Sequence, residues 1–144
     1  MATTRRAEAT WSGDLIGGNG KVTAATTRVF ADLPTTWKAR TEEADGVTSP
    51  EELLAAAHAS CFSMALSHGL AQGGHTPERL ETSATVTFVP GEGITKAALT
   101  VVGRVPGLDE AAFVEAADAA KDGCPVSSAL KGNVELTLDA RLQD

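Results

Sequence analysis

The pattern of hydrophobic and polar positions changes twice along the chain. The first forty residues contain short apolar alternations, separated by the turn cluster Gly17-Gly18-Asn19-Gly20 and by Pro34. Such alternation between turn residues is typical of short strands, so we expect an antiparallel meander here. The alternations lie around Ala9–Trp11, Val22–Ala24 and Thr36–Ala39.

A long uncharged segment follows: residues 53–77 contain no Asp, Glu, Lys or Arg. It is preceded by Ser49-Pro50-Glu51-Glu52, in which a capping serine, a first-turn proline and two acidic residues predict the start of a helix. Gly73-Gly74 predicts its end. Because the segment is hydrophobic on nearly all sides, we expect a central helix enclosed by protein. Its histidines, serines and alanines favour this over a membrane span.

Two apolar alternations after this helix predict a hairpin. They cover Thr82–Val89 and Ile94–Val105, and the sequence Pro90-Gly91-Glu92-Gly93 between them is typical of a turn. Gly103 lies inside the second alternation, where an isolated glycine predicts a bulge.

The last third of the chain predicts two helices and a strand. Asp109 can cap a helix that continues to about Asp122 and ends at Gly123, and a short helix follows from Pro125 to Lys131. Alternation over Val134–Leu142 indicates a strand with one face in water. Together these elements predict a single α+β domain over residues 1–144, in which helices cover one face of an antiparallel sheet.

Composition and charge narrow the classes of function. A chain of 144 residues fits one domain, and its hydrophobic content of 42% is ordinary. Aromatic residues make up only 4% and Tyr is absent, so the core is thin and a partner chain could complete it. The net charge of −7, without any basic run, argues against nucleic acid as a partner. The first eleven residues do not resemble a secretory signal, so we expect a cytoplasmic protein.

The two cysteines lie in different settings. Cys61 lies about 15 Å along the predicted helix from Glu51, whereas Cys124 begins the sequence Cys-Pro-Val-Ser-Ser at a predicted helix start. A helix start lowers the pKa of a thiol, which favours a thiolate at Cys124. Cys61 is therefore either an inert buried thiol or a reactive one served by a cation from elsewhere in the fold. In a reducing cytoplasm, a bond between the two would be transient and catalytic.

Few charged residues could serve these thiols. Arg40, at the end of a predicted strand, and the lysines that flank Cys124, Lys121 and Lys131, are the candidate cations. Glu51 could hold an arginine in place, although a favourable first-turn acid is the simpler interpretation. For most of the cations, a solvated surface charge is the simpler interpretation too.

His58 lies three residues before Cys61 and so shares its helix face, which raises two possibilities. One is a Cys–His nucleophile pair, and the other is a metal site with His68 and His75. A single His-x-x-Cys spacing is weak evidence for zinc, so we expect no metal and interpret His58 as a satisfied, partly buried histidine.

Two segments resemble the OsmC/Ohr family and, within it, the osmotically inducible OsmC branch. They are Thr-Ser-Pro-Glu-Glu-Leu-Leu-Ala-Ala-Ala-His-Ala-Ser-Cys-Phe-Ser-Met-Ala-Leu at 48–66 and Gly-Cys-Pro-Val-Ser at 123–127, and the opening Trp-Ser-Gly-Asp at 11–14 and the closing strand agree as well. The resemblance implies an OsmC-like α+β fold, wrapped around the long helix as an intertwined homodimer. It also implies a thiol peroxidase that reduces organic hydroperoxides and, less efficiently, hydrogen peroxide.

The same resemblance implies the roles of four residues. Cys61 matches the peroxidatic cysteine, Cys124 the resolving cysteine, Arg40 the arginine that stabilises the thiolate, and Glu51 the glutamate that holds this arginine. The implied cycle passes through a Cys61 sulfenic acid and a Cys61–Cys124 disulfide, which requires the Cys124 segment to lie against the central helix. It needs no cofactor, but it needs an external reductant, either a small dithiol or a lipoyl-type protein.

Two other functions remain compatible with the sequence. The chain could be a non-catalytic redox sensor or small-ligand binding protein that uses the same dimer-interface pocket, in which case it would be oxidised once rather than cycle. It could also be a stress-induced protein whose cysteines only pack, in which case both thiols would react slowly with alkylating reagents below their ordinary pKa.

Overall fold

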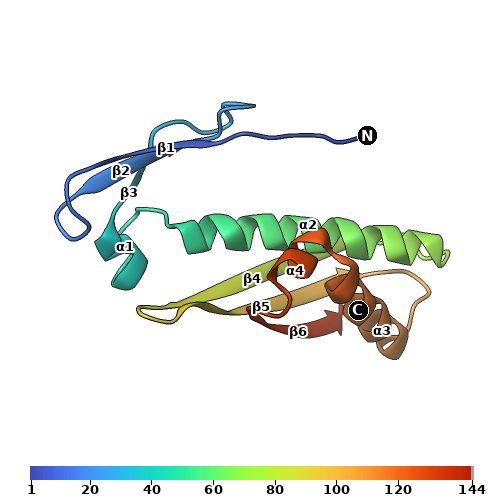
Figure 1. Ribbon diagram of the computed structural model, residues 1–144. Coiled ribbons are helices and arrows are strands. Elements are labelled where there is room, and N and C mark those ends of the chain that lie inside the picture. Colours follow the sequence, from blue (N-terminus) through green and yellow to red (C-terminus); the bar gives the residue numbers. More distant parts are fainter. Residues whose placement is uncertain (144) are drawn as a thin grey trace. The chain divides into compact units, whose positions relative to one another are not determined.

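A computed structural model describes residues 1–143, which divide into two compact units, Met1–Pro50 and a second unit from Glu51 onward. The first unit contains the antiparallel sheet β1-β2-β3 and a short helix, α1 (Figure 1). The strands are β1 (Glu8–Ser12), β2 (Asn19–Thr23) and β3 (Leu33–Thr35), and the helix is α1 (Trp37–Thr41). The predicted antiparallel meander is present, but its third strand is β3 and not the predicted segment Thr36–Ala39.

The prediction of a strand at Thr36–Ala39 is wrong, because this segment begins α1. Thr36 has an extended backbone, and its hydroxyl accepts a hydrogen bond from the Ala39 amide at 3.1 Å, as in a helix N-cap. At the other end of α1, the hydroxyl of Thr41 donates to the carbonyl of Trp37 at 2.9 Å. Arg40 therefore lies on a helix rather than at the end of a strand.

The second unit is a three-stranded sheet with helices. Its elements are α2 (Pro50–Gln72), β4 (Arg79–Val89), β5 (Gly93–Arg104), α3 (Glu110–Gly123), α4 (Pro125–Leu130) and β6 (Glu135–Leu142). β4 and β5 form the predicted hairpin, and the α+β class is confirmed. β6, however, pairs parallel with β5, so the sheet is mixed. The direction follows from the connection, because the chain crosses over through α3 and α4 before it returns as β6.

The core of this unit lies between α2, α3 and one face of the sheet, along which α2 runs (Figure 1). On β5 the buried residues alternate with more exposed ones, so one face of the sheet is dry. The side chains that form the core come from all three elements: Phe62, Leu66 and Leu70 of α2, Ala97, Leu99 and Val101 of β5, and Phe113, Ala117 and Ala120 of α3.

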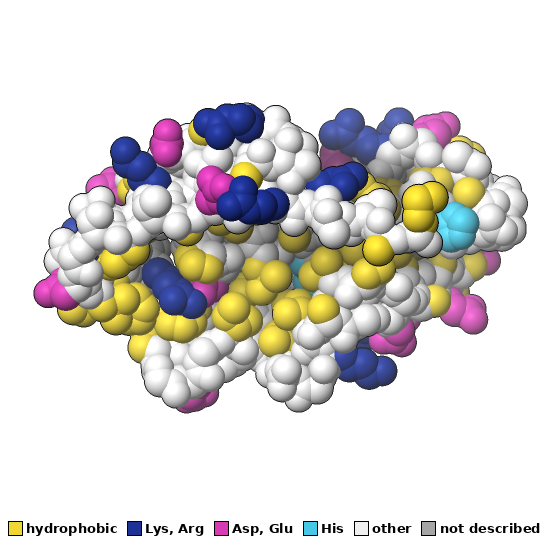
Figure 2. Space-filling model, turned by 45° about the horizontal axis from the view of Figure 1, so that its top comes forward, with side chains coloured by type: hydrophobic (Ala, Val, Ile, Leu, Met, Phe, Trp, Pro, Cys, Tyr) yellow, Lys and Arg dark blue, Asp and Glu magenta, His cyan; other side chains and the backbone are white. Residues whose placement is uncertain are grey.

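α2 is buried along one stripe only, so the predicted enclosure on all sides is not found in this chain. Five of its 23 residues are buried: Glu51, His58, Phe62, Leu66 and Leu70. Met64, on another side of the helix, is 70% exposed, and Figure 2 shows hydrophobic side chains on the protein surface. By length and composition alone α2 could cross a membrane, a test that core helices of soluble proteins also pass. The four-residue spacing of the buried stripe is that of a helix lying on a sheet.

The bulge predicted at Gly103 is also wrong, since the irregularity in the hairpin lies between Thr87 and Phe88. Gly103 pairs with Leu80 and lies directly under the ring of Phe113. A Cβ atom at position 103 would lie 2.5 Å from Cζ of Phe113, which is too close for two carbon atoms. The glycine is thus explained by close packing of α3 on β5.

We therefore expect Gly103→Ala to lower the free energy of unfolding by about 1 to 3 kcal/mol, because the added methyl group overpacks the core. Gly123→Ala is the matched control, because a Cβ there would have no atom within 4 Å. Urea denaturation of both variants measures the difference. Equal stability of the two variants would contradict this account of Gly103.

Candidate active site

The two thiols, 63 positions apart in the sequence, contact each other in the fold. Cys61 lies on α2 and is half-buried, and Cys124 lies at the junction of α3 and α4 and is fully buried. Both are free thiols, and each is near enough to affect the pKa of the other. The amide of Cys124 bonds to the carbonyl of Ala120 at 2.9 Å, and Pro125 then starts α4. The predicted contact between the Cys124 segment and the long helix is therefore present.

The two thiols differ in pKa. Burial raises the pKa of Cys61, and the hydrogen bond and charge of Cys124 add to this, while the amide of Val126 opposes it. Burial also raises the pKa of Cys124, but it is outweighed by hydrogen bonds from the Ser127 amide, the Cys61 thiol, the Ser127 hydroxyl and the Val126 amide. The net effect is a lowered pKa at Cys124 and a raised one at Cys61. Between these two thiols, the thiolate is thus favoured at Cys124.

Neither Glu51 nor Arg40 is a sequence neighbour of the two cysteines. Glu51 is in the first turn of α2, 7% exposed, and about 15 Å along the helix axis from Cys61. Its carboxylate could therefore affect the thiol only through another group. Arg40 lies on α1 in the other compact unit, with its guanidinium carbon 5.8 Å from the centre of the Trp37 ring, within the range of a cation–π contact.

His58 is fully buried and faces α4 rather than a metal. Its Nε2 atom lies 2.8 Å from the hydroxyl oxygen of Ser127, which is 1% exposed. Burial lowers the pKa of His58, so the ring is neutral at neutral pH. Among residues 1–143, no group of three or more His, Cys, Asp and Glu side chains could hold a metal ion.

Ser127 was missed by the sequence analysis. One signal could have identified it: Ser127 lies three residues after Cys124, as His58 lies three residues before Cys61. Residues three apart lie on the same face of a helix. If the two helices contact each other through their cysteines, His58 and Ser127 are therefore brought together as well.

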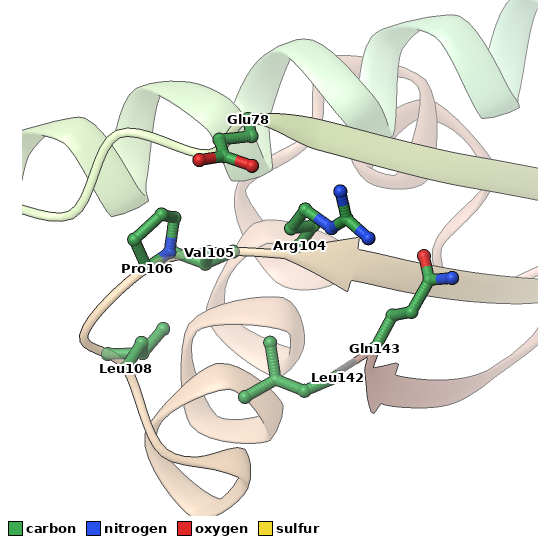
Figure 3. Close-up of a pocket in the computed structure, with 7 residues that line it drawn as sticks. All are labelled: Glu78, Arg104, Val105, Pro106, Leu108, Leu142 and Gln143. Carbon is green, nitrogen blue, oxygen red and sulfur yellow. The ribbon is translucent and has the colours of Figure 1, made fainter.

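Two hollows lie on the surface of the second unit. One, of about 470 Å³, lies where the sheet ends, and its lining residues are drawn in Figure 3: Glu78, Arg104, Val105, Pro106, Leu108, Leu142 and Gln143. The other, of about 570 Å³, lies between α2 and the start of β4, and its lining includes Met64 and His68. Neither hollow is lined by Cys61 or Cys124.

An α+β fold that brings two free thiols into contact, one of them with a lowered pKa, defines a protein of thiol–disulfide redox chemistry. The family model described as OsmC-like protein matches residues 42–139. Peroxiredoxin OsmC of Escherichia coli is 42% identical over 146 aligned residues, which cover 99% of each chain. The chain belongs to the OsmC family.

Two further relatives agree with this assignment. The organic hydroperoxide resistance protein OhrB of Bacillus subtilis is 33% identical over 95 residues, which cover 65% of this chain and 70% of OhrB. The crystal structure of an organic hydroperoxide resistance protein OsmC from Legionella pneumophila superposes with a TM-score of 0.69 at 25% identity and covers 98% of each chain. The OsmC-like fold expected from the sequence is thereby confirmed.

Proposed function

We propose that the protein is a cysteine-based peroxidase that reduces organic hydroperoxides to alcohols and, less efficiently, hydrogen peroxide to water. The observation that carries the proposal is the contact between the Cys61 and Cys124 thiols. It is supported by the full-length similarity to a protein named peroxiredoxin OsmC and by the similarity to organic hydroperoxide resistance proteins.

In the proposed cycle, the Cys61 thiolate attacks the distal oxygen of the hydroperoxide and the O–O bond breaks. The alkoxide leaves and takes up a proton to give the alcohol, while Cys61 becomes a sulfenic acid. The Cys124 thiolate then attacks the Cys61 sulfur, hydroxide leaves as water, and the disulfide forms. An external dithiol, small or lipoyl-type, reduces the disulfide and is itself oxidised. Metal, haem and flavin are not needed, because the thiolate supplies both electrons.

Arg40 and Glu51 have supporting roles in this proposal. Cys61 is the attacking thiol, yet burial raises its pKa in the protomer. A cation is therefore required to stabilise its thiolate, and the proposal assigns this role to Arg40 and the positioning of that arginine to Glu51.

The proposed cytoplasmic enzyme is a homodimer. The apolar surface of α2 that stays exposed in the protomer supports this assembly, because a surface of this kind is typically covered by another chain.

Steady-state kinetics test the proposed function. Alkyl, fatty-acid and hydrogen peroxides are each supplied with a monothiol or a dithiol reductant, and we expect repeated turnover that is fastest with an organic hydroperoxide and the dithiol. Oxidation of only one equivalent per protomer with either reductant would instead indicate a redox sensor. Slow alkylation of both thiols below their ordinary pKa would indicate packing alone.

We expect Arg40→Ala to slow hydroperoxide turnover at neutral pH about tenfold or more, because loss of a nearby cation raises the pKa of Cys61 and depletes its thiolate. Activity should recover as the pH rises, so the pH–rate profile moves to higher pH. Lys38→Ala removes an exposed cation of the same helix and is the matched control. A pH–rate profile that is the same for both variants would exclude Arg40 from this role.

A further inference from the structure

Three buried side chains lie next to one another, beginning at His58, passing through Ser127 and ending at Cys124. The Nε2 atom of His58 contacts the hydroxyl of Ser127 at 2.8 Å. Ser127 lies one helical turn after Cys124 at the start of α4, so the two buried side chains are neighbours and the hydroxyl lowers the pKa of the Cys124 thiol. All three residues are at most 1% exposed. Water therefore does not compete for these bonds, and their directions are set by the three groups themselves.

The other ring nitrogen of His58 determines those directions. Nδ1 is buried and has no hydrogen-bond partner among the described residues. If Nδ1 carried the proton, a buried N–H donor would be left unsatisfied, which is costly, and Nε2 would accept the Ser127 hydrogen. If Nε2 carries the proton, it donates to Ser127, and the Ser127 hydrogen is free to point at Cys124. The second arrangement satisfies every hydrogen in the chain.

We propose that His58 and Ser127 are positioning residues for the resolving cysteine: the Nε2–H of His58 donates to the Ser127 oxygen and so directs the Ser127 hydroxyl hydrogen onto the sulfur of Cys124. This inference deepens the proposed peroxidase cycle and rests on it for its kinetic consequence. No proton is transferred along the chain; the hydroxyl stabilises the negative charge on the sulfur.

The electrostatics of the site agree with this arrangement. Burial keeps His58 neutral, so the ring can hold a single proton at Nε2, and the Ser127 hydroxyl is one of the groups that lower the pKa of Cys124. Among the described residues, Cys61 is the titratable group that interacts with Cys124. A lowered pKa increases the fraction of Cys124 that is ionised at a given pH, and this thiolate can attack the Cys61 sulfenic acid as soon as it forms, before a second peroxide oxidises it further.

The first test measures the Cys124 thiolate directly, in a Cys61→Ser background that cannot turn over peroxide. The ultraviolet absorbance of the thiolate is followed against pH. We expect Ser127→Ala to lower the thiolate fraction at neutral pH roughly tenfold, because a hydrogen bond to a charged group is lost. Ser128→Ala, which removes the exposed neighbouring hydroxyl, should leave the titration unchanged.

The histidine is tested by two substitutions in the same background. His58→Gln keeps an N–H donor near the position of Nε2 and should titrate close to the parent, whereas His58→Leu should shift the titration in the same direction as Ser127→Ala. His68→Leu, at an exposed position of α2, is the control. Nitrogen-15 spectra of the histidine rings should show the proton of His58 on Nε2, and a proton on Nδ1 would overturn the proposal even if His58→Leu does not fold.

The second test separates the steps of the cycle after one equivalent of hydroperoxide is added to the chain with both cysteines. We expect Ser127→Ala to leave sulfenic acid formation at Cys61 nearly unchanged and to slow disulfide formation several-fold. The variants could melt at a lower temperature while Cys124 titrates and forms the disulfide as in the wild type. In that case the contacts between His58, Ser127 and Cys124 are only structural, and the proposal fails. If instead no peroxide is turned over by the wild type, the proposed function fails while the thiolate titration still decides this inference.

Discussion

Cys61→Ser is expected to abolish hydroperoxide turnover, with a loss of about a thousandfold or more, to the rate of the uncatalysed reaction. A serine hydroxyl is not ionised at neutral pH and is a poor nucleophile for a peroxide oxygen. It is close in size to the thiol, so the half-buried position on α2 and its contact with Cys124 should be kept. Steady-state consumption of cumene hydroperoxide with a dithiol reductant measures the effect, and an unchanged melting temperature shows that the variant is folded.

This experiment also decides which thiol attacks. Within the protomer, hydrogen bonds lower the pKa of Cys124 and burial raises the pKa of Cys61, so the isolated chain favours the opposite assignment of roles. If Cys61→Ser still consumes one equivalent of peroxide and forms a sulfenic acid at Cys124, the proposed order of the two cysteines is wrong. Trapping of the sulfenic acid with dimedone, followed by mass spectrometry, locates the oxidised residue.

The local signals in the sequence predicted the elements of the fold well. Asp109 caps α3 through a hydrogen bond from the Ala112 amide at 2.8 Å, and the chain leaves α2 through Gly74, which has a φ of +86° that a glycine adopts without strain. The parallel pairing of β6 was not predicted, because alternation shows which face of a strand is buried but not its direction. Thr36–Ala39 was misassigned because a two-residue alternation in so short a segment fits a strand and a capped helical turn equally well.

The candidate site was predicted in part. The contact of Cys61 with the Cys124 segment follows from the resemblance and is present in the fold, but the roles of the two thiols, Arg40 and Glu51 stay predictions. Ser127 was missed because the sequence Cys-Pro-Val-Ser-Ser does not by itself show which serine is buried, and the matching spacing of His58 and Cys61 was not compared with it. The packing of α4 on α2 makes that choice, since Ser127 is buried and Ser128 is exposed. In the same way, the sequence does not show that one side of α2 stays exposed in the fold, because its apolar residues lie on nearly all sides of the helix.

Cys124→Ser is expected to separate peroxide reduction from the completion of the cycle. The Cys61 thiolate should still consume one equivalent of hydroperoxide per protomer at nearly the wild-type rate, because its attack does not use the second cysteine. The Cys61 sulfenic acid should then accumulate instead of the disulfide, and steady-state turnover with a dithiol should fall by roughly tenfold or more while excess peroxide oxidises the sulfenic acid to the irreversible sulfinic acid.

Mass spectrometry of Cys124→Ser after graded additions of hydroperoxide should show first one and then two added oxygen atoms on Cys61, whereas the wild type should show only the disulfide. Ser128→Cys in this variant is a stringent control, because it restores a thiol to α4 at an exposed position. It should not restore disulfide formation, since a thiol that points away from α2 cannot reach the Cys61 sulfur. If Cys124→Ser turns over peroxide as fast as the wild type and never accumulates sulfenic acid, Cys124 is not the resolving cysteine, and its contact with Cys61 serves packing alone.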